Sequence, residues 1–327
     1  MVRDAHADSR MVSVYRKENG GKASALNFGL TRARYDVVIA LDADTIFARD
    51  TMDELVQPLA DPKVGAVAGN AKVGNRINLV TRWQALEYVT SQNLDRRAFS
   101  LLNGITVVPG AVGAWRKSLI EAAGGFRADT LAEDQDLTLS IRQEGYSIAY
   151  ADGAIGYTEA PDTFRALAKQ RFRWSFGTLQ CAWKYRHTLL NPRYGSLGWA
   201  ALPNTWLFQL ILPAISPLAD LAFVFSLLSI ALTRSEHGAT YAMASMAHVF
   251  TYYAVFLLVD WLAAAIAFLM EPGEDKSLTW LILIQRFAYR QLMYWVVVRS
   301  FKAAFVGRGV GWGKLDRKAT VQLPVAS

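Results

Sequence analysis

The sequence predicts an α/β domain with a mostly parallel sheet, followed by α-helical membrane segments. Three features point to this arrangement: apolar strand patterns alternate with helical patterns early in the chain, charges are regular up to about Arg193, and the last third is apolar. No Lys or Arg occurs from Ser196 to Leu232. The 327 residues, 52% of them hydrophobic, suffice for one medium-sized soluble domain and a membrane part.

The expected elements of the α/β domain follow one another closely along the chain. Strands are expected at four short apolar or β-branched runs, Met11–Tyr15, Asp36–Leu41, Val64–Ala68 and the glycine-bearing Val107–Gly113. Helices are expected at Lys22–Arg32, Asp50–Leu59, Leu137–Glu144 and Phe164–Lys184. Ligands of parallel sheets bind beyond the carboxyl ends of the strands, so the residues after Leu41 are a candidate site.

Three apolar stretches in the last third approach the roughly 20 residues that are needed to cross a bilayer. They are Asn204–Leu232, which Pro213 and Pro217 interrupt, Ala247–Met270 and Leu278–Val298. Because a basic tail follows the third stretch, the positive-inside rule puts that tail and the N-terminal domain on the cytoplasmic side. The number of crossings must then be even, so either the first stretch is a hairpin or one stretch does not cross.

Charge and cysteine content exclude several classes of protein. The single cysteine, Cys181, excludes an internal disulfide, and the four histidines show no spacing typical of a zinc site. The formal net charge is +7, and basic residues gather beside the apolar stretches, at Arg171–Arg193 and Arg299–Lys318. This distribution favours anionic lipid headgroups as their partner, and not nucleic acid.

Asp42-Ala43-Asp44 directly follows the expected strand Asp36–Leu41. Two carboxylates at this spacing can bind one hard divalent cation through oxygen, and Mg²⁺ would then bridge to a diphosphate. An isolated pattern of this kind is more often an acidic turn after a strand. The residues alone leave both interpretations open.

Lys22 lies in Asn19-Gly20-Gly21-Lys22, at the start of an expected helix. Glycines allow close backbone approach and a helix N-terminus favours an anion, which is typical of a phosphate-binding turn. The alternative is an ordinary glycine turn with a solvated lysine.

Glu133, Asp134 and Asp136 precede the expected helix Leu137–Glu144. Acidic residues at a helix start complement the helix dipole, which is a sufficient structural reason for them. A functional hypothesis is that one of these carboxylates faces a cleft and acts as the general base for a hydroxyl nucleophile.

The expected helix Phe164–Lys184 carries Gln170-Arg171-Phe172-Arg173-Trp174. Arginine suits a diphosphate, and tryptophan offers a stacking surface for a sugar ring. The alternative is an amphipathic helix at a bilayer surface, where Arg and Trp are both common. Both interpretations can hold together.

Taken in order, N-G-G-K-A-x-A-L-N, D-x-D after an apolar strand, E-D and Q-x-x-R-W resemble the processive family 2 glycosyltransferases. That group includes cellulose, chitin, hyaluronan and poly-N-acetylglucosamine synthases. Five further stretches look most like bacterial poly-β-1,6-N-acetylglucosamine synthases: Gly69–Arg76, Trp83–Tyr88, Ser91–Arg97, Thr158–Pro161 and Tyr289–Tyr294. The resemblance covers nearly the whole chain.

The resemblance implies a GT-A fold, which is Rossmann-like, and a UDP-sugar donor, with UDP-N-acetylglucosamine expected. It implies inversion, with Asp134 as the general base that deprotonates the acceptor hydroxyl. The implied metal ligands, for Mg²⁺ or Mn²⁺, are Asp42 and Asp44. The implied donor-binding residues are Lys22, Asp42, Asp44 and Arg173, and the implied acceptor-binding residues are Gln170, Trp174 and Glu133. The family's usual T-E-D reads Ala132-Glu133-Asp134 here.

Four segments follow from the resemblance: a catalytic domain at 1–162, an interface helix with Q-x-x-R-W at 163–195, membrane or interfacial helices at 196–300, and a basic cytoplasmic tail at 301–327. The expected location is the inner (plasma) membrane, multi-pass, with a cytoplasmic catalytic domain. Expected partners are the UDP-sugar, the growing exopolysaccharide of a biofilm, membrane lipid, and small accessory or export subunits.

Family members begin with a strand and a uridine-binding aspartate pair that would lie upstream of Met1. The resemblance therefore predicts an N-terminally truncated chain with an unpaired sheet edge. The alternatives are transfer of one sugar to a lipid carrier, an inactive remnant, and a transporter or structural membrane protein. Within the third apolar stretch, Gln285, Arg286, Arg290 and Gln291 either line a route for nascent polysaccharide or snorkel from an interfacial helix.

Overall fold

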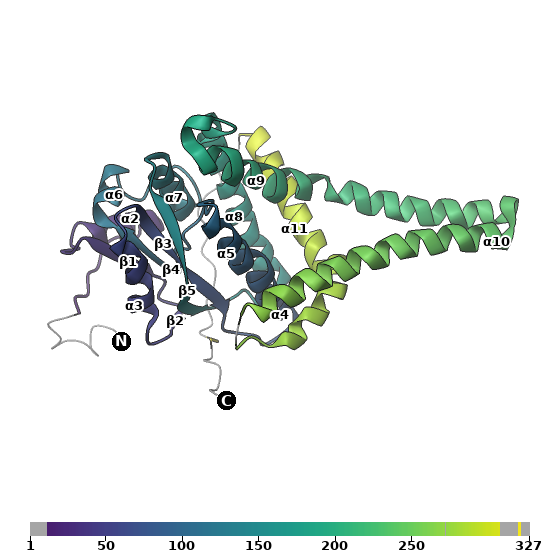
Figure 1. Cartoon of the computed structure of the whole chain (residues 1–327), viewed down its shortest axis with the longest axis horizontal. Coiled ribbons are helices and arrows are strands. Elements are labelled where there is room, and N and C mark those ends of the chain that lie inside the picture. The colour runs from purple at the N-terminus through teal and green to yellow at the C-terminus, as the bar shows by residue number, and fades with distance from the viewer. Residues whose placement is uncertain (1–11, 272, 308–319, 322–327) are drawn as a thin grey trace.

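The computed structural model describes residues 12–271, 273–307 and 320–321. Figure 1 shows an α/β domain at one end of the molecule and a long helical hairpin that extends from it at the other end. The α/β domain begins with helix α2 (Gly21–Leu30), and helices α8 (Phe164–Lys184) and α11 (Ile282–Phe305) connect it to the hairpin.

A five-stranded sheet forms the centre of the α/β domain. Its spatial order is β1 (Val37–Leu41), β4 (Val112–Arg116), β3 (Val64–Val73), β5 (Ser147–Thr158) and β2 (Ile46–Phe47). Only β3 and β5 pair in parallel, whereas β1–β4, β3–β4 and β2–β5 are antiparallel. The sheet is therefore mixed, and the prediction of a mostly parallel sheet is wrong.

The strand that makes the sheet mixed is β4, which lies between β1 and β3. A buried central strand is apolar whichever way it runs, so its sequence does not reveal its direction. Since β1 and β3 both run antiparallel to β4, they point the same way, and β5 points with them. The carboxyl ends of these three strands thus face one end of the domain, as the rule for ligand sites requires.

Helices cover both faces of the sheet. All ten residues of β3 are buried, and alternate residues enter different cores: Ala66 and Ala68 pack on one face, Val67 and Ala71 on the other. The first face is covered by α2, α6 (Lys117–Ala122) and α7 (Glu133–Gln143). The second is covered by α3 (Thr51–Val56), the 3₁₀ turn η1 (Gln57–Ala60), α4 (Leu79–Glu87) and residues at the ends of the hairpin and α11.

Most of the expected elements are confirmed, and two strands are not. Residues 12–15 form no strand, and Val12, Val14 and Tyr15 are exposed; Met11 lies outside the described residues. Within Val107–Gly113 the strand begins only at Val112. Pro109 cannot donate to a ladder, and its carbonyl oxygen instead accepts the Val112 N–H at 3.1 Å.

The edge of β1 that faces away from β4 has no partner strand among the described residues. An unpaired edge was expected at this part of the sheet. After α4 the chain continues through η2 (Tyr88–Asn93) into α5 (Leu94–Leu101), and these helices lie between the sheet and α11.

The apolar last third forms a hairpin and one further helix. After α8 come two 3₁₀ turns, η3 (Arg186–Thr188) and η4 (Pro192–Tyr194). A continuous helical segment follows, made of the π-helical η5 (Leu197–Ala201), α9 (Leu202–Asn204) and the π-helical η6 (Thr205–Ile211). Helix α10 (Leu212–Leu269) then runs outward and back as two arms (Figure 1), and the Phe223 and Tyr253 rings of the two arms stack at 5.1 Å. The chain continues through η7 (Lys276–Leu281) into α11.

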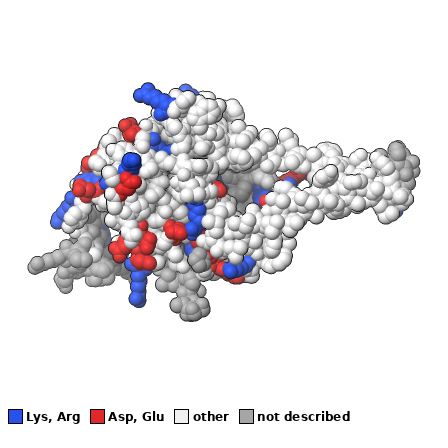
Figure 2. Space-filling model, viewed as in Figure 1, with Lys and Arg blue, Asp and Glu red and all other residues white. Residues whose placement is uncertain are grey.

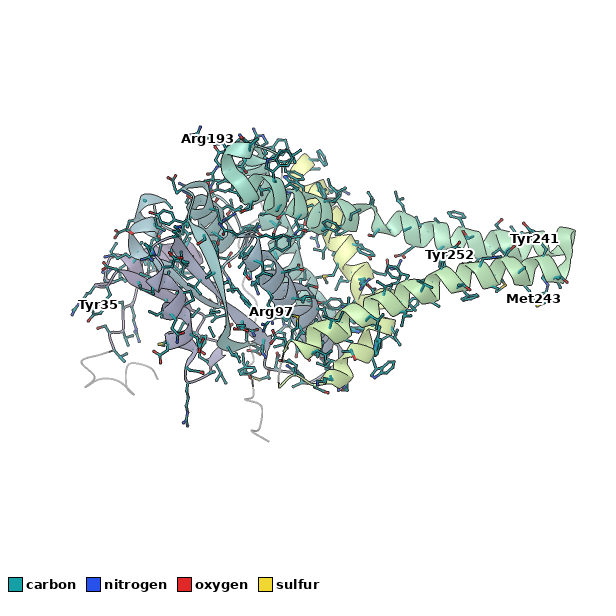
Figure 3. All side chains as sticks on the ribbon, in the orientation of Figure 1. Tyr35, Arg97, Arg193, Tyr241, Met243 and Tyr252 are labelled. Carbon is teal, nitrogen blue, oxygen red and sulfur yellow. The ribbon has the colours of Figure 1, made fainter. Side chains whose placement is uncertain are left out.

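Two helical segments are long and apolar enough to cross a membrane, judged by length and composition: Leu197–Leu232 and Ala239–Leu269. Figure 2 shows that, on the face in view, most charged side chains lie on the α/β domain and few lie on the hairpin. Met243 and Tyr252, labelled in Figure 3, extend outward and are 65% and 76% exposed. An apolar surface of this length in a helical hairpin suits lipid.

The third apolar stretch forms most of α11 and is not among these candidate spans. Its arginines face the arms of the hairpin. Arg286 pairs with Asp220 at 2.6 Å, and Arg290 pairs with Asp260 at 2.8 Å. The two candidate spans agree in number with the even count that the charge distribution predicts.

Candidate active site

The site lies at the carboxyl end of β1, where Asp42-Ala43-Asp44 leads from β1 to β2. Asp42 and Asp44 are half-buried, and Ala43 between them is exposed. The Nζ atom of Lys22 lies 2.8 Å from Oδ1 of Asp42 and 3.9 Å from Oε1 of Glu133. Residues that are far apart in sequence therefore meet at the position that the sequence marks as a candidate ligand site, beyond Leu41.

The glycine turn before α2 places Lys22 at the site. Gly21 has a φ of +83°, a conformation that glycine adopts at little cost, and its N–H donates to Oδ1 of Asn19 at 3.1 Å. Lys22 is then the second residue of α2. The turn thus directs the lysine toward Asp42, with which it forms an ion pair.

Asp134 lies in the first turn of α7, and its two carboxylate oxygens have different partners. Oδ2 accepts the Gly110 N–H at 3.0 Å, and Oδ1 accepts the Gln135 N–H at 2.8 Å. A Cβ atom on Gly110 would lie only 2.7 Å from Nζ of Lys22. Glycine at this position therefore lets the loop before β4 fit between Lys22 and Asp134 and fix the carboxylate.

The charges of the site influence one another. Burial raises the pKa of Glu133, the negative charge of Asp134 raises it further, and Lys22 and Arg173 act in the opposite direction. For Lys22, burial lowers the pKa, but the surrounding carboxylates Asp42, Asp134 and Glu133 outweigh it, so that the pKa is raised. Lys22 is therefore a cation at neutral pH.

Helix α8 holds the start of α7 in place. A Cβ atom on Gly177 would lie 2.8 Å from that of Ala132, so the two backbones pack closely. The Leu131 N–H donates to Oε1 of Gln180 at 2.9 Å, and Oγ1 of Thr178 donates to Oε1 of Gln135 at 2.9 Å. The helix that carries Q-x-x-R-W thus positions the loop that carries Glu133 and Asp134.

The residues of Q-x-x-R-W have separate surroundings. Gln170 is 4% exposed, and its Oε1 accepts no hydrogen bond from the part of the chain that the structure describes. Arg173 acts electrostatically on Glu133. Trp174 packs beside the core that includes β3, with the guanidinium of Arg171 4.2 Å from its ring centroid.

Arg171 has a role that the sequence interpretation did not assign. Its Nη2 lies 2.8 Å from Oε2 of Glu87 on α4, and the Tyr289 hydroxyl of α11 also contacts that carboxylate. Arg171 is buried, so this ion pair links α8, α4 and α11 inside the protein. Two features of the sequence could have indicated this ion pair: Arg171 lies on the apolar side of the expected helix Phe164–Lys184, and Glu87 lies in the stretch Trp83–Tyr88.

The carboxylates of the D-x-D turn fit a divalent cation. Mg²⁺ in nucleotide sites is usually bound by one or two carboxylates and completes its coordination with phosphate oxygens and water. Asp42 and Asp44 provide that set of oxygen ligands at a partly open turn. Among the described residues no group of three or more His, Cys, Asp or Glu side chains is arranged for a metal.

Arg96 on α5 also belongs near the site, although the sequence interpretation assigned it no role. It lies within electrostatic reach of Asp134, Tyr88 and Tyr150, and burial lowers the pKa of its guanidinium. In the sequence, Arg96 is marked only by its neighbour Arg97 and by its place in Ser91–Arg97, a stretch that resembles poly-β-1,6-N-acetylglucosamine synthases.

The fold and the site together define a glycosyltransferase of the GT-A type. The chain belongs to the family described as glycosyl transferase family group 2, whose model matches residues 37–298. This confirms the family that the motifs indicated.

The chain is similar to known synthases over part of its length. It is 34% identical over 162 residues to the poly-β-1,6-N-acetyl-D-glucosamine synthase of Staphylococcus aureus, covering 49% of this chain and 39% of the relative. The synthase of the same name from Staphylococcus epidermidis is 32% identical over 160 residues with the same coverage. The match thus spans about two fifths of the length of these curated relatives.

A solved structure shares the fold. The mannosyltransferase from Pyrobaculum calidifontis, in complex with GDP-Man and Mn²⁺, superposes with a TM-score of 0.58 at 21% sequence identity. The alignment covers 94% of this chain and 74% of the mannosyltransferase.

Proposed function

We propose that this chain is the catalytic core and membrane part of an inverting glycosyltransferase that polymerises UDP-N-acetylglucosamine into a β-linked exopolysaccharide. The observation that carries the proposal is the meeting of Lys22, Asp42, Glu133 and Asp134 at the carboxyl end of β1, next to the Q-x-x-R-W helix. The relation to poly-β-1,6-N-acetyl-D-glucosamine synthases supports the choice of sugar.

The donor side consists of Lys22, Asp42, Asp44 and Arg173. The two aspartates would hold Mg²⁺ or Mn²⁺, which neutralises negative charge on the departing nucleotide diphosphate. Lys22 adds a positive charge next to them. Arg173, which already acts on Glu133, supplies guanidinium donors that match phosphate oxygens. The complex of the mannosyltransferase with GDP-Man and Mn²⁺ supports a nucleotide sugar and a divalent cation on this fold.

Asp134 is the proposed general base. Its carboxylate is oriented by the Gly110 and Gln135 N–H groups, so it can accept the proton of an acceptor hydroxyl as that oxygen attacks the anomeric carbon. The bond to the diphosphate breaks on the opposite side, and the α-linked donor becomes a β-linked product. The proton stays on Asp134 until solvent removes it.

The acceptor side is assigned to Gln170, Trp174 and Glu133. The buried Oε1 of Gln170 is an acceptor that a sugar hydroxyl can satisfy. Trp174 offers an aromatic ring on which the apolar face of a sugar can stack. Glu133 borders both Lys22 and Arg173, at the junction of donor and acceptor.

The two spans of the hairpin anchor the enzyme in the plasma membrane, with the α/β domain on the cytoplasmic side where UDP-sugars are available. Residues 1–162 form the catalytic domain, 163–195 the interface helix, 196–300 the membrane part and 301–327 a cytoplasmic tail. The growing polymer and membrane lipid contact the molecule during synthesis, and small accessory or export subunits would act on the polymer.

The test is to supply the membrane-embedded chain with radiolabelled UDP-N-acetylglucosamine, UDP-glucose or GDP-mannose. We expect polymer from the first donor alone. The Asp134→Asn variant should lose at least about 100-fold in rate and keep its affinity for UDP, since a positioned base contributes about 10²–10⁴-fold. Asp53→Asn, at an exposed carboxylate on α3, is the control. Full polymer synthesis by Asp134→Asn would remove Asp134 from the role of base.

A second candidate function is the transfer of one sugar to a lipid carrier. The long apolar hairpin favours this function, because a lipid phosphate carrier would reach the site from the membrane. The same assay distinguishes the two functions, since a single-sugar lipid enters organic solvent and a polymer does not.

A further inference from the structure

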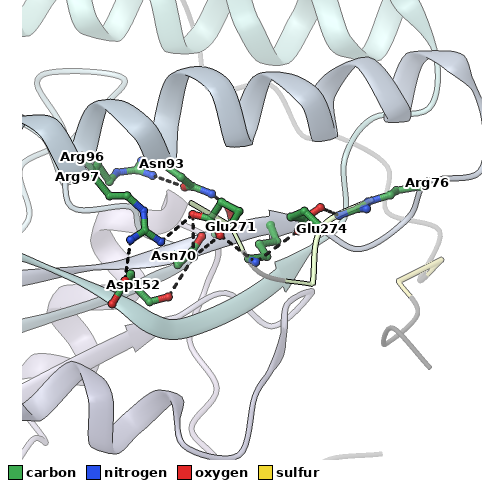
Figure 4. Close-up of polar contacts among 10 residues, drawn as sticks. Asn70, Arg76, Asn93, Arg96, Arg97, Asp152, Glu271 and Glu274 are labelled. Carbon is green, nitrogen blue, oxygen red and sulfur yellow. Dashed lines mark hydrogen bonds and ion pairs between the residues drawn. The ribbon is translucent and has the colours of Figure 1, made fainter. Parts of the chain in front are cut away.

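Two adjacent arginines on α5 face different partners (Figure 4). Arg97 is held from two sides, by Glu271 at 3.1 Å and Asp152 at 2.7 Å. Within the described ranges, Arg96 makes one hydrogen bond, from its Nη1 to Oδ1 of Asn93 at 3.4 Å. This bond is long, so most of the donor capacity of the Arg96 guanidinium is left for another group.

Arg97 belongs to a buried ion network that ties the end of the hairpin to the sheet. Lys72 on β3 lies 3.0 Å from Glu271 and 3.4 Å from Glu274, and these three side chains are 4%, 3% and 2% exposed. Arg76 also pairs with Glu274, at 2.5 Å. Charges buried to this extent are held firmly, because a partner left alone would be strongly destabilising. The loop that follows the second arm thus fixes the position of α5.

Arg96 lies within electrostatic reach of Asp134, and so does Lys22. The carboxylates that act on Lys22 are Asp42 on the donor side, Glu133 on the acceptor side and the proposed base Asp134. The groups near Arg96 are Asp134 and two tyrosines, Tyr88 and Tyr150.

Tyr150 packs against the core cluster that includes Val108 and Leu137, which are close in the chain to Gly110 and Asp134. Its strand β5 is separated by β4 and β3 from β1, which leads to the donor residues Asp42 and Asp44. Arg96 and Tyr150 therefore border the base away from the donor residues, on the side from which an acceptor hydroxyl approaches.

Tyr150 offers a second polar group at this position. Its hydroxyl is buried and has no hydrogen-bond partner in residues 12–271, 273–307 or 320–321. Its ring centroid lies 5.6 Å from the guanidinium of Arg97, so the network that holds Arg97 also borders Tyr150. A buried hydroxyl without a partner is costly unless a ligand or water satisfies it.

We propose that Arg96 and Tyr150 bind hydroxyl or acetamido groups of the acceptor sugar, and that Glu271 positions them by holding Arg97. A guanidinium, a phenol and aromatic rings beside a general base match the chemistry of a sugar, whose polar edge needs donors and whose flat face packs on rings. This rests on the proposed function and adds residues to it. In this proposal, the loop after the hairpin, which carries Glu271, supports the acceptor site.

The test measures binding of two probes to the purified full chain in detergent: a β-1,6-linked N-acetylglucosamine pentasaccharide, and UDP-N-acetylglucosamine with Mg²⁺. We expect Arg96→Lys and Tyr150→Phe each to weaken pentasaccharide binding, the former by about 10- to 100-fold, as for the loss of a hydrogen bond to a charged group. Donor affinity should stay within twofold. Tyr150→Phe removes a single oxygen and so keeps the packing. Arg34→Lys, at an exposed arginine, is the matched control.

The role of Glu271 is tested by a double-mutant cycle. Glu271→Gln should weaken pentasaccharide binding, and the Glu271→Gln, Arg96→Lys double variant should lose less than the sum of the two single losses, because Glu271 acts in part by positioning Arg96. Additive losses, or equal losses for donor and pentasaccharide, would show a general structural role and overturn the positioning.

Unchanged pentasaccharide binding in both Arg96→Lys and Tyr150→Phe would overturn the acceptor site, and so would a wild-type chain that does not bind the pentasaccharide. If the wild-type chain binds the pentasaccharide as expected but makes no polymer, the proposed polymerisation fails while the acceptor site stands.

Discussion

Replacing Gly110 with alanine should impair transfer without unfolding the protein. The added Cβ would lie 2.7 Å from Nζ of Lys22, where ordinary contacts begin at 3.4 Å, so the ammonium group must move by about 0.7 Å. The atom in the way is the end of a flexible side chain, and the backbone of Gly110 is not among those with positive φ. The free energy of unfolding should therefore change by less than about 1 kcal/mol.

The displacement acts on the contact between Lys22 and Asp42, which is 2.8 Å long. The substitution also places the new Cβ 3.4 Å from Oδ2 of Asp134, the carboxylate that the Gly110 N–H orients. Shifts of this size between reacting groups cost up to about 100-fold in rate. We expect a loss of about 10- to 100-fold in transfer and a raised KM for the donor.

The assay is the initial rate of radiolabelled sugar transfer as a function of donor concentration, together with the thermal midpoint of unfolding. Gly29→Ala is the matched control, because it lies on the same helix as Lys22 and its Cβ would meet no atom within 4 Å. That variant should keep the wild-type rate. A Gly110→Ala protein that transfers sugar within twofold of wild type would refute the close packing of Lys22, Gly110 and Asp134.

Three further predictions concern the metal, the acceptor and pH. Asp44→Ala should weaken donor binding only when Mg²⁺ or Mn²⁺ is present, and wild-type activity that survives EDTA unchanged would contradict the metal site. Trp174→Ala should shorten the polymer while hydrolysis of the donor continues, whereas Trp174→Phe should retain most of the length; normal polymer from a membrane-bound alanine variant would leave Trp174 a structural role only. Since the pKa of Glu133 is raised in the folded state, its ionised form costs stability above that pKa. Glu133→Gln should therefore raise the thermal midpoint at pH 8, and this gain should disappear as the pH falls below the usual pKa of a glutamate; an equal gain at pH 4 and pH 8 would contradict it.

The parts of the fold that follow from local patterns could be predicted from the sequence. The apolar run of β1 and the acidic turn after it are neighbours in the chain, and helix α8 has the expected bounds Phe164–Lys184 because its periodicity and flanking residues are local. The direction of β4 depends on which strands it lies between, which is a property of the whole sheet.

The same distinction applies to the site. Lys22, Asp42, Glu133 and Asp134 could be proposed because each stands in a short motif, and the structure brings them together. Glu271 has no such motif, and its partner Arg97 is 174 residues away in sequence. Long-range ion pairs of this kind leave no local trace, and so the buried network could be found only in three dimensions.

The ion pairs between α11 and the hairpin impose an order on the biosynthesis of the protein. Asp220 and Asp260 leave the ribosome before Arg286 and Arg290, which neutralise them in the finished molecule. An aspartate near the middle of a membrane helix costs up to about 3.5 kcal/mol at insertion. Under the membrane anchoring proposed above, a newly inserted hairpin carries two uncompensated acids until α11 has been translated and has docked. A chain that ends before α11 would leave this hairpin exposed to membrane proteases, so a premature stop there should remove the protein from the membrane rather than release a shorter stable one.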